Sequence, residues 1–218
     1  MHSVEVIKKE VKNISLKVKP TCEVTLTVPF ETDEKYIAHI LKKRKAWIEQ
    51  KIAFFQSYKQ EHKKEYVSGE SFKYLGKSYR LKVIASEHES VKLLRGYIQL
   101  FVKNRDDYEK KEQLLNAWYR AKAFDYFSKI VEQYAPIVQK EVTSLKIRQM
   151  KSRWGSCNPS KGYINLNCEL IKKPRSCIEY VIFHELAHLV HDNHSRAFYN
   201  YLNTYMPDWK RRKERLEA

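Results

Sequence analysis

Residues 181–194, VIFHELAHLVHDNH, combine four histidines and a glutamate with a run of apolar residues. His184 and His188 are four residues apart, so on a helix both imidazoles lie on one face about one turn apart. Glu185, between them, is offset around the helix and would lie beside a bound ion without having to ligate it. This HExxH spacing is typical of two zinc ligands and a carboxylate that takes a proton from water.

A catalytic zinc site needs a third protein ligand and an open position. His191 and His194 are the nearest candidates. On a straight helix His191 would rise roughly 10 Å above His184, at about 1.5 Å per residue, whereas zinc–nitrogen bonds are only about 2 Å long. Asp192 and Asn193 are turn formers, and a turn there would swing His194 back toward the ion. We therefore expect His194 to be the third ligand. We expect His191 to support a ligand without binding the ion itself.

A competing interpretation is an ordinary apolar helix whose histidines are structural. A bare HExxH motif arises often by chance. Here the motif lies within an apolar helix, where unpaired His and Glu side chains would be costly to bury, and a further histidine follows just beyond a predicted turn. These features favour a metal site with Zn²⁺ as cofactor.

Hydrophobic periodicity predicts the helices and strands that position residues 181–194. Residues 4–30 alternate apolar and polar side chains around a PTCE connection, which predicts a β-hairpin, and a helix follows with Thr32 as its N-cap. Residues 60–71 are charged and then turn-like. We therefore predict an N-terminal strand–helix region over 1–65 and a second domain over 66–218, with one continuous unit as the alternative.

The second region alternates between strand and helix patterns. Residues 72–85 and 90–102 each predict two strands, and 106–140 predict one long helix in which Pro136 is a candidate break. Residues 145–174 predict strand, turn and strand. The histidine helix would begin at Ser176, because Glu179 three residues later completes a capping box. Another helix would stop before Pro207 and precede a short basic helix.

Composition limits the class of protein. With 218 residues, 43% of them hydrophobic and only 5 glycines and 6 prolines, the chain is neither disordered nor fibrous. The formal net charge of +16 is suited to binding nucleic acid, an acidic partner or an anionic membrane surface. The alternative is that the positive charges form a solvated surface without a partner. The start, MHSVEVIKKE, lacks an apolar stretch, no run is long enough to span a membrane, and the 4 cysteines form no CxxC pair. We therefore expect a cytoplasmic protein without a membrane partner.

Two segments carry a resemblance to a known family. SRWGSCNPSKGYINLNCELIKKP and IEYVIFHELAHLVHDNHSRAFYNYLNTYMPDWKRRKERLE resemble the YgjP-like (DUF45) zinc metallopeptidase family, which is related to M48-type and SprT-like zincins, and the likeness extends upstream over nearly the whole chain. It implies an α+β, zincin-like fold with an N-terminal β-hairpin and helix and a small antiparallel sheet. His184, His188 and His194 fall on its ligand positions and Glu185 on its catalytic position. His191 stands where metzincins, whose spacing is similar, place glycine.

The leading hypothesis is therefore a zinc metallopeptidase that hydrolyses protein or peptide substrates, with Glu185 as general base. Arg153, His191 and Tyr199 are candidates for supporting a ligand or contacting the substrate. The alternative is a nucleic-acid-associated protein, or a protease of DNA-bound proteins, in which zinc is mainly structural. The charge of +16 and the stretches KKRKAW and WKRRKERLE support that alternative. A structural zinc normally has four protein ligands, and the three strong candidates here favour the catalytic hypothesis.

Overall fold

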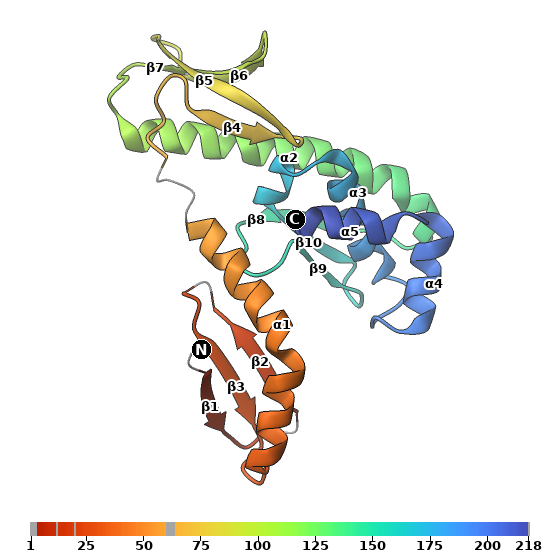
Figure 1. The fold of residues 1–218 in the computed structure, drawn as a ribbon. Coiled ribbons are helices and arrows are strands. Elements are labelled where there is room, and N and C mark those ends of the chain that lie inside the picture. Colours follow the sequence, from red (N-terminus) through yellow and green to blue (C-terminus); the bar gives the residue numbers. More distant parts are fainter. Residues whose placement is uncertain (1–3, 12, 20, 60–63, 218) are drawn as a thin grey trace. The chain divides into compact units, whose positions relative to one another are not determined.

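The structure of the chain, a computed structural model, describes residues 4–11, 13–19, 21–59 and 64–217 (Figure 1). The chain divides into two compact units, Met1–Lys64 and Glu65–Ala218. This division falls within the segment 60–71, of which residues 60–63 lie outside the described part. The assignment of 1–65 and 66–218 to separate domains stays a prediction. None of the described helices is long and apolar enough to cross a membrane.

The first unit is a three-stranded sheet with one helix. β2 (Ser15–Val18) and β3 (Val24–Val28) form the predicted antiparallel hairpin, and β1 (Val4–Lys8) adds to β3 in parallel. The alternating pattern of β3 buries its apolar residues, and α1 (Glu34–Lys59) contributes buried Ile37, Ile48 and Ile52. The prediction of Thr32 as N-cap was wrong: the helix begins after Asp33, whose Oδ1 accepts a hydrogen bond from the Lys35 N–H at 3.2 Å.

The second unit begins with a four-stranded sheet in the order β4-β5-β7-β6. Its strands are β4 (Ser71–Tyr74), β5 (Lys77–Ala85), β6 (Ser90–Leu94) and β7 (Tyr97–Val102). The two predicted hairpins are both present, β4–β5 and β6–β7, and their turn residues have positive φ angles. β5 and β7 pair in parallel, so the sheet as a whole is mixed.

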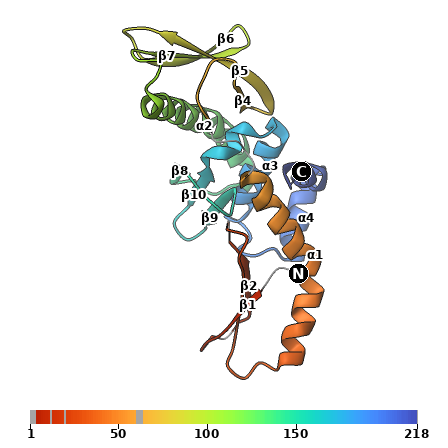
Figure 2. The same ribbon diagram turned by 60° about the vertical axis from the view of Figure 1, so that its left-hand side comes forward.

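The long helix α2 (Tyr108–Val138) connects this sheet to the rest of the unit. Its N-cap is Asp107, whose side chain accepts from the Lys110 N–H, and Pro136 lies within its last turn without breaking it. The N-terminal half packs under the sheet, where the Tyr119 hydroxyl donates to the Lys73 carbonyl at 2.9 Å. The C-terminal half runs beside the later helices (Figures 1 and 2).

A second small sheet, a 3-10 helix and three α-helices complete the unit. β8 (Ser144–Arg148), β10 (Tyr163–Asn167) and β9 (Gly155–Asn158) form a sheet in which β9 is an edge strand antiparallel to β10. The 3-10 helix η1 (Cys168–Lys172) follows, then α3 (Arg175–Ala187), α4 (Arg196–Tyr205) and α5 (Trp209–Glu217). The predicted capping box at Ser176 was wrong. The N-cap of α3 is Pro174, which makes no side-chain cap, and the Glu179 carboxylate instead accepts from Arg212 on α5.

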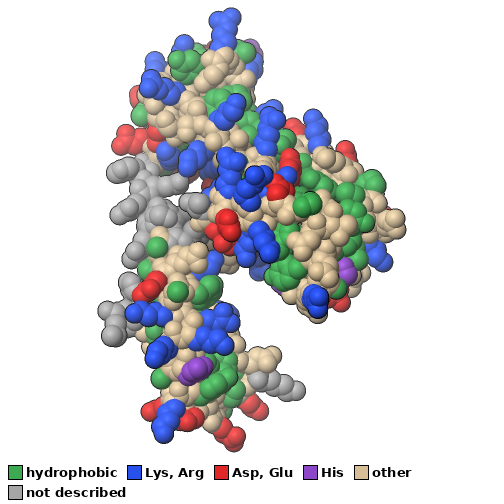
Figure 3. Space-filling view, turned by 45° about the vertical axis from the view of Figure 1, so that its right-hand side comes forward, with side chains coloured by type: hydrophobic (Ala, Val, Ile, Leu, Met, Phe, Trp, Pro, Cys, Tyr) green, Lys and Arg blue, Asp and Glu red, His purple; other side chains and the backbone are tan. Residues whose placement is uncertain are grey.

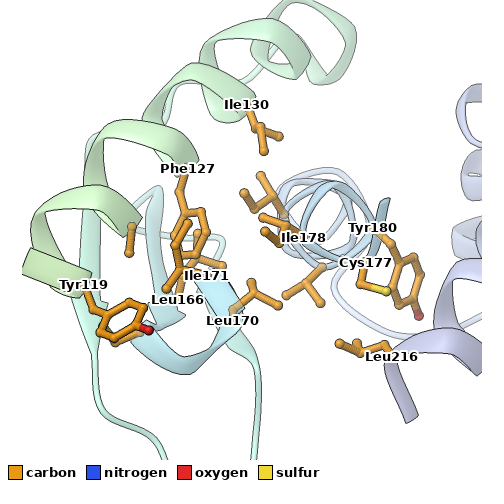
Figure 4. Packing of buried hydrophobic residues seen from close by; sticks show 14 of the residues in the cluster. Tyr119, Phe127, Ile130, Leu166, Leu170, Ile171, Cys177, Ile178, Tyr180 and Leu216 are labelled. Atoms are coloured by element: carbon orange, nitrogen blue, oxygen red, sulfur yellow. The ribbon is translucent and has the colours of Figure 1, made fainter. Parts of the chain in front are cut away.

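One hydrophobic core joins these layers. Phe127 and Ile130 of α2 face Leu166 of β10, and Ile178 of α3 (Figure 4). On the other side of α3, Cys177 and Tyr180 lie near Leu216 of α5 (Figure 4). The α3 helix is thus buried on several faces, which explains its apolar sequence. The α+β class is confirmed.

Candidate functional site

The end of α3 and the start of α4 bring three histidines together. His184 lies in the last turn of α3, and His188 is the C-cap residue, where the helix ends. The chain then turns through Asp192 and Asn193 and enters α4 at its N-cap, Ser195. One ring nitrogen from each of His184, His188 and His194 lies within 4.8 Å of the other two.

Two of these imidazoles face each other directly. Nε2 of His194 is 2.9 Å from Nε2 of His184. Nδ1 of His188 lies 3.1 Å from the carbonyl oxygen of His191. Because a carbonyl only accepts hydrogen bonds, Nδ1 of His188 carries the proton and its Nε2 keeps a free lone pair. His188 is thus held in the tautomer that can bind a cation through Nε2.

The ring of Phe198, on α4, packs against the imidazoles of all three histidines. Its side chain is 0% exposed, and its ring centroid lies 5.0 Å from that of His184, 4.7 Å from His188 and 4.8 Å from His194. The hydroxyl of Ser195 accepts from the Phe198 N–H and so starts the helix that carries this ring. The role of Phe198 was not predicted from the sequence. Its only signal is the apolar spacing to Leu202 along α4.

His184 packs against Tyr180 and Phe198 as well as against the other two histidines. Nδ1 of His184 is buried without a hydrogen-bond partner among the described residues. Tyr180 lies edge-on to its ring, with 5.8 Å between centroids. Burial, reinforced by the neighbouring His188 and His194, lowers the pKa of His184 to about 3. The imidazole is therefore neutral, which is the form that ligates metals.

Glu185 is buried beside this group, with 7% of its surface exposed. Burial raises the pKa of Glu185 to about 7, and the positive charge of Arg153 opposes this shift. The carboxylate lies against β9, because a Cβ added at Gly155 would be 2.7 Å from its Oε1. Gly155, within the RWGSC segment, therefore leaves the space that the carboxylate fills.

The loop before β9 is organised by Asn167, a buried residue whose role was not predicted from the sequence. Its Nδ2 donates to the carbonyls of Met150, at 2.8 Å, and Arg153, at 3.1 Å. Its backbone N–H donates to the Trp154 carbonyl at 2.8 Å. The strand that carries Gly155 is thus tied to β10 just before it reaches Glu185.

The three further candidates are placed at different distances from the histidines. Arg153 is exposed, and its positive charge acts on Glu185. The ring of His191 packs on Tyr201, at 5.3 Å, while its backbone carbonyl reaches His188. Tyr199 stacks on Trp209 at 5.3 Å and lies 6.2 Å from His194. Among these candidates, His191 alone is hydrogen-bonded to a member of the histidine group, through its backbone.

The donor set fits a small transition-metal ion. Zinc–nitrogen bonds of about 2.0–2.1 Å in tetrahedral geometry separate two ligand nitrogens by about 3.3 Å. The 2.9 Å between the His184 and His194 nitrogens is close to that separation. Three imidazole nitrogens within 4.8 Å of one another, with a buried carboxylate beside them, are typical of metal-dependent peptidases.

Comparison with known proteins agrees with this class. The profile of the YgjP-like metallopeptidase domain matches residues 12–218, so the chain belongs to the YgjP-like metallopeptidase family and is a protease. No curated protein matches it. Two solved structures are similar to part of it: the metallopeptidase zymogens abylysin of Pyrococcus abyssi and jannalysin of Methanocaldococcus jannaschii. Each is 22% identical with a TM-score of 0.38 over 41% of this chain, which covers 90% of the abylysin and 92% of the jannalysin chain.

Proposed function

We propose that the protein is a zinc-dependent peptidase in which His184, His188 and His194 hold the ion through Nε2 and Glu185 is the general base. The main support for this proposal is that the three ring nitrogens lie within 4.8 Å of one another. When bound, Zn²⁺ would supply a Lewis acid that acidifies a water and polarises the scissile carbonyl. Protein or peptide chains are the substrates of such an enzyme.

The position and burial of Glu185 support its proposed role in proton transfer. Its carboxylate is one residue from His184 and is held against Gly155. In the proposed reaction a carboxylate oxygen accepts a proton from the attacking water while the new C–O bond forms. The same oxygen then returns the proton to the amine nitrogen as the C–N bond breaks. Burial keeps competing water away from this oxygen.

A mainly structural zinc is less well supported. Structural zinc sites normally have four protein ligands. Among the described residues, the group consists of three histidines and includes no cysteine. A fourth coordination position is therefore left for water or substrate. The four cysteines are unpaired, which supports the further proposal that the enzyme works in the reducing cytoplasm.

The test combines metal content with hydrolysis of an unbiased peptide library. We expect the purified wild-type protein and Glu185→Gln to carry about one zinc per chain and only the wild type to cleave. His184→Ala and His194→Ala should lose the zinc. His191→Ala is the matched control, since its ring packs on Tyr201 and only its backbone reaches His188. A fully active Glu185→Gln variant, or zinc retained by both ligand variants, would overturn the proposal.

A further inference from the structure

The four-stranded sheet has one face in the core and one face in solvent. Apolar residues of β5 and β7, such as Leu81, Val83, Ile98 and Leu100, are buried in the core that α2 shares. Strand geometry sends the alternate residues to the opposite face. Those residues, which we call the outer face, are Ser71, Lys73, Ser78, Arg80, Lys82, Ile84, Ser90, Lys92, Leu94, Tyr97, Gln99 and Phe101.

The strand register groups these side chains into rows. One row runs across three strands through Arg80, Tyr97 and Leu94, of which Tyr97 is 44% exposed and Leu94 50%. The next row contains Lys82, Gln99 and Lys92. The third contains Ile84, Phe101 and Ser90. Basic side chains therefore alternate with aromatic rings across one surface.

The charge of the outer face has a single sign. The four strands, all of them described, contain no Asp or Glu. Arg80, Lys82 and Lys92 form no ion pair with any described residue, and Lys and Arg side chains stand on the part of the molecule that carries this sheet (Figure 3). Two nearby carboxylates, Glu87 and Glu89, lie in the β5–β6 connection and pair with Lys103 and Lys110. The face thus presents unpaired positive charge.

The two aromatic rings are placed beside these charges. Tyr97 lies opposite Arg80 in the register, and the Lys92 ammonium is 5.6 Å from the centroid of the Phe101 ring. Tyr97 and Phe101 are four residues apart on one strand, which separates them by about 13 Å at ~3.3 Å per residue. The Tyr97 ring is exposed, and the Phe101 ring is half-buried. Aromatic rings at the surface beside basic side chains are the features by which proteins hold unstacked bases and the phosphates that join them.

From these observations we infer that the outer face of the β4–β7 sheet binds single-stranded nucleic acid. Bases stack on Tyr97 and Phe101, while Arg80, Lys82, Lys92 and Lys73 neutralise the backbone. An anionic membrane or a polyanion without bases would use the charges but would have no need for the rings. The inference does not rest on the peptidase proposal, because no residue of the outer face belongs to the histidine group.

The test is the fluorescence anisotropy of labelled oligothymidylate and oligouridylate, each about 12 nucleotides long, with the full chain at about 50 mM salt. The two oligonucleotides distinguish DNA from RNA as the source. We expect Tyr97→Ala to weaken binding about fivefold or more and Tyr97→Phe to retain it. The matched control is Phe124→Ala, which removes an aromatic ring on α2 that is 50% exposed. It should leave the affinity unchanged.

The charges are tested by a second matched pair. Lys82→Ala/Lys92→Ala should weaken binding and reduce the salt dependence by about 0.7 in log–log slope per lost phosphate contact. Lys129→Ala/Lys140→Ala removes the same charge from exposed positions in and after α2 and should have little effect. Glu185→Gln should bind like the wild type, which separates this inference from the peptidase proposal.

Four outcomes would overturn the inference. The first is that neither oligonucleotide binds at low salt, and the second is that the two lysine pairs lose equal affinity. The third is that Tyr97→Ala keeps its affinity for the oligonucleotides while inorganic polyphosphate binds the protein equally tightly. The fourth is that the protein binds phosphatidylserine vesicles but no oligonucleotide. Circular dichroism of each variant checks that the sheet remains folded.

Discussion

Gly155 lies so close to Glu185 that no side chain fits between them. A Cβ at position 155 would be 2.7 Å from both Cγ and Oε1 of Glu185, and 2.9 Å from Cδ. Real Cβ atoms do not make such contacts, so either the carboxylate or β9 would have to move. Glycine at this position is therefore explained by the neighbouring carboxylate.

Gly155→Ala should accordingly displace the proposed base without removing the metal ligands. We expect kcat to fall on the order of 100-fold, because a displacement of about 1 Å at a reacting group has an effect of that size. Zinc content should stay at the wild-type level. The measurement is peptide hydrolysis, with kcat and KM determined separately, alongside metal analysis.

Ser156→Ala is the control for this substitution. It lies in the same strand and adds no atoms, although it removes the hydroxyl that accepts from Asn165 Nδ2 at 3.4 Å. Its kcat should remain within a few-fold of wild type. Full activity in Gly155→Ala would mean that the position of the Glu185 carboxylate is not important for the reaction.

The type of most elements could be predicted from the sequence because periodicity and turn residues act locally. Residues 145–174 are an exception, since the predicted strand, turn and strand are three strands and the 3-10 helix η1. The Asp192-Asn193 turn likewise predicted that His194 returns toward His184, and the structure brings these two side chains together. The parallel pairing of β5 with β7 could not be predicted, since sheet order depends on contacts far apart along the chain. Gly155 and Phe198 were missed for the same reason: their partners lie on other elements.

Phe198 should matter for metal affinity as well as for stability. Phe198→Leu would replace the ring against which all three histidines pack with a smaller side chain. We expect a loss of folding free energy on the order of 1–2 kcal/mol, together with a weaker affinity for zinc because the imidazoles gain freedom. Urea unfolding measures the first effect and competition with a chromogenic chelator measures the second.

Phe127→Leu separates these two effects. Phe127 is also 0% exposed but lies in the core between α2 and β10. It should cost similar folding free energy while the zinc affinity stays unchanged. If both variants reduced zinc affinity equally, the role assigned to Phe198 would be contradicted.

Stability at acid pH should depend on Asp208, at the start of α5. Burial acts to raise the pKa of Asp208, but hydrogen bonds from Arg212 and Arg211 outweigh it and hold the pKa below the usual 3.8. Nε of Arg212 is 2.8 Å from Oδ1, and Arg212 also reaches Glu179 on α3. A depressed folded-state pKa stabilises the protein above the unfolded value of 3.8, and this contribution is lost as the pH falls through the folded value.

Asp208→Asn keeps the shape of the side chain and removes its charge. The difference in unfolding free energy between wild type and variant should be about 0.2–1 kcal/mol near neutral pH and should shrink as the pH falls below about 4. Urea unfolding across this pH range measures it. High salt should reduce the difference at neutral pH, and a difference that is constant at every pH would contradict the assignment.

The β4–β5 turn should contribute to stability through its contacts with the end of η1 and with Pro174, the N-cap residue of α3. The Leu75 N–H donates to the Ile171 carbonyl at 2.9 Å, and the Gly76 N–H donates to the Lys172 carbonyl at 3.2 Å. Gly76 has a φ of +79°, and a Cβ there would be 2.8 Å from Cα of Pro174. Alanine would thus suffer both an unfavourable backbone conformation and a clash with the backbone that precedes the helix of His184.

Gly96 in the β6–β7 turn allows these two effects to be separated. Its φ is +80°, but a Cβ there would meet nothing within 4 Å. Gly96→Ala should therefore lose about 1 kcal/mol of folding free energy from the backbone alone. Gly76→Ala should lose a further ~1–3 kcal/mol from the clash. Urea unfolding measures the free energy of unfolding of both variants. Because Gly76 and Gly96 have similar φ angles, the clash with Pro174 is the difference between the two variants. Equal losses of folding free energy would therefore show that the β4–β5 turn does not press on Pro174.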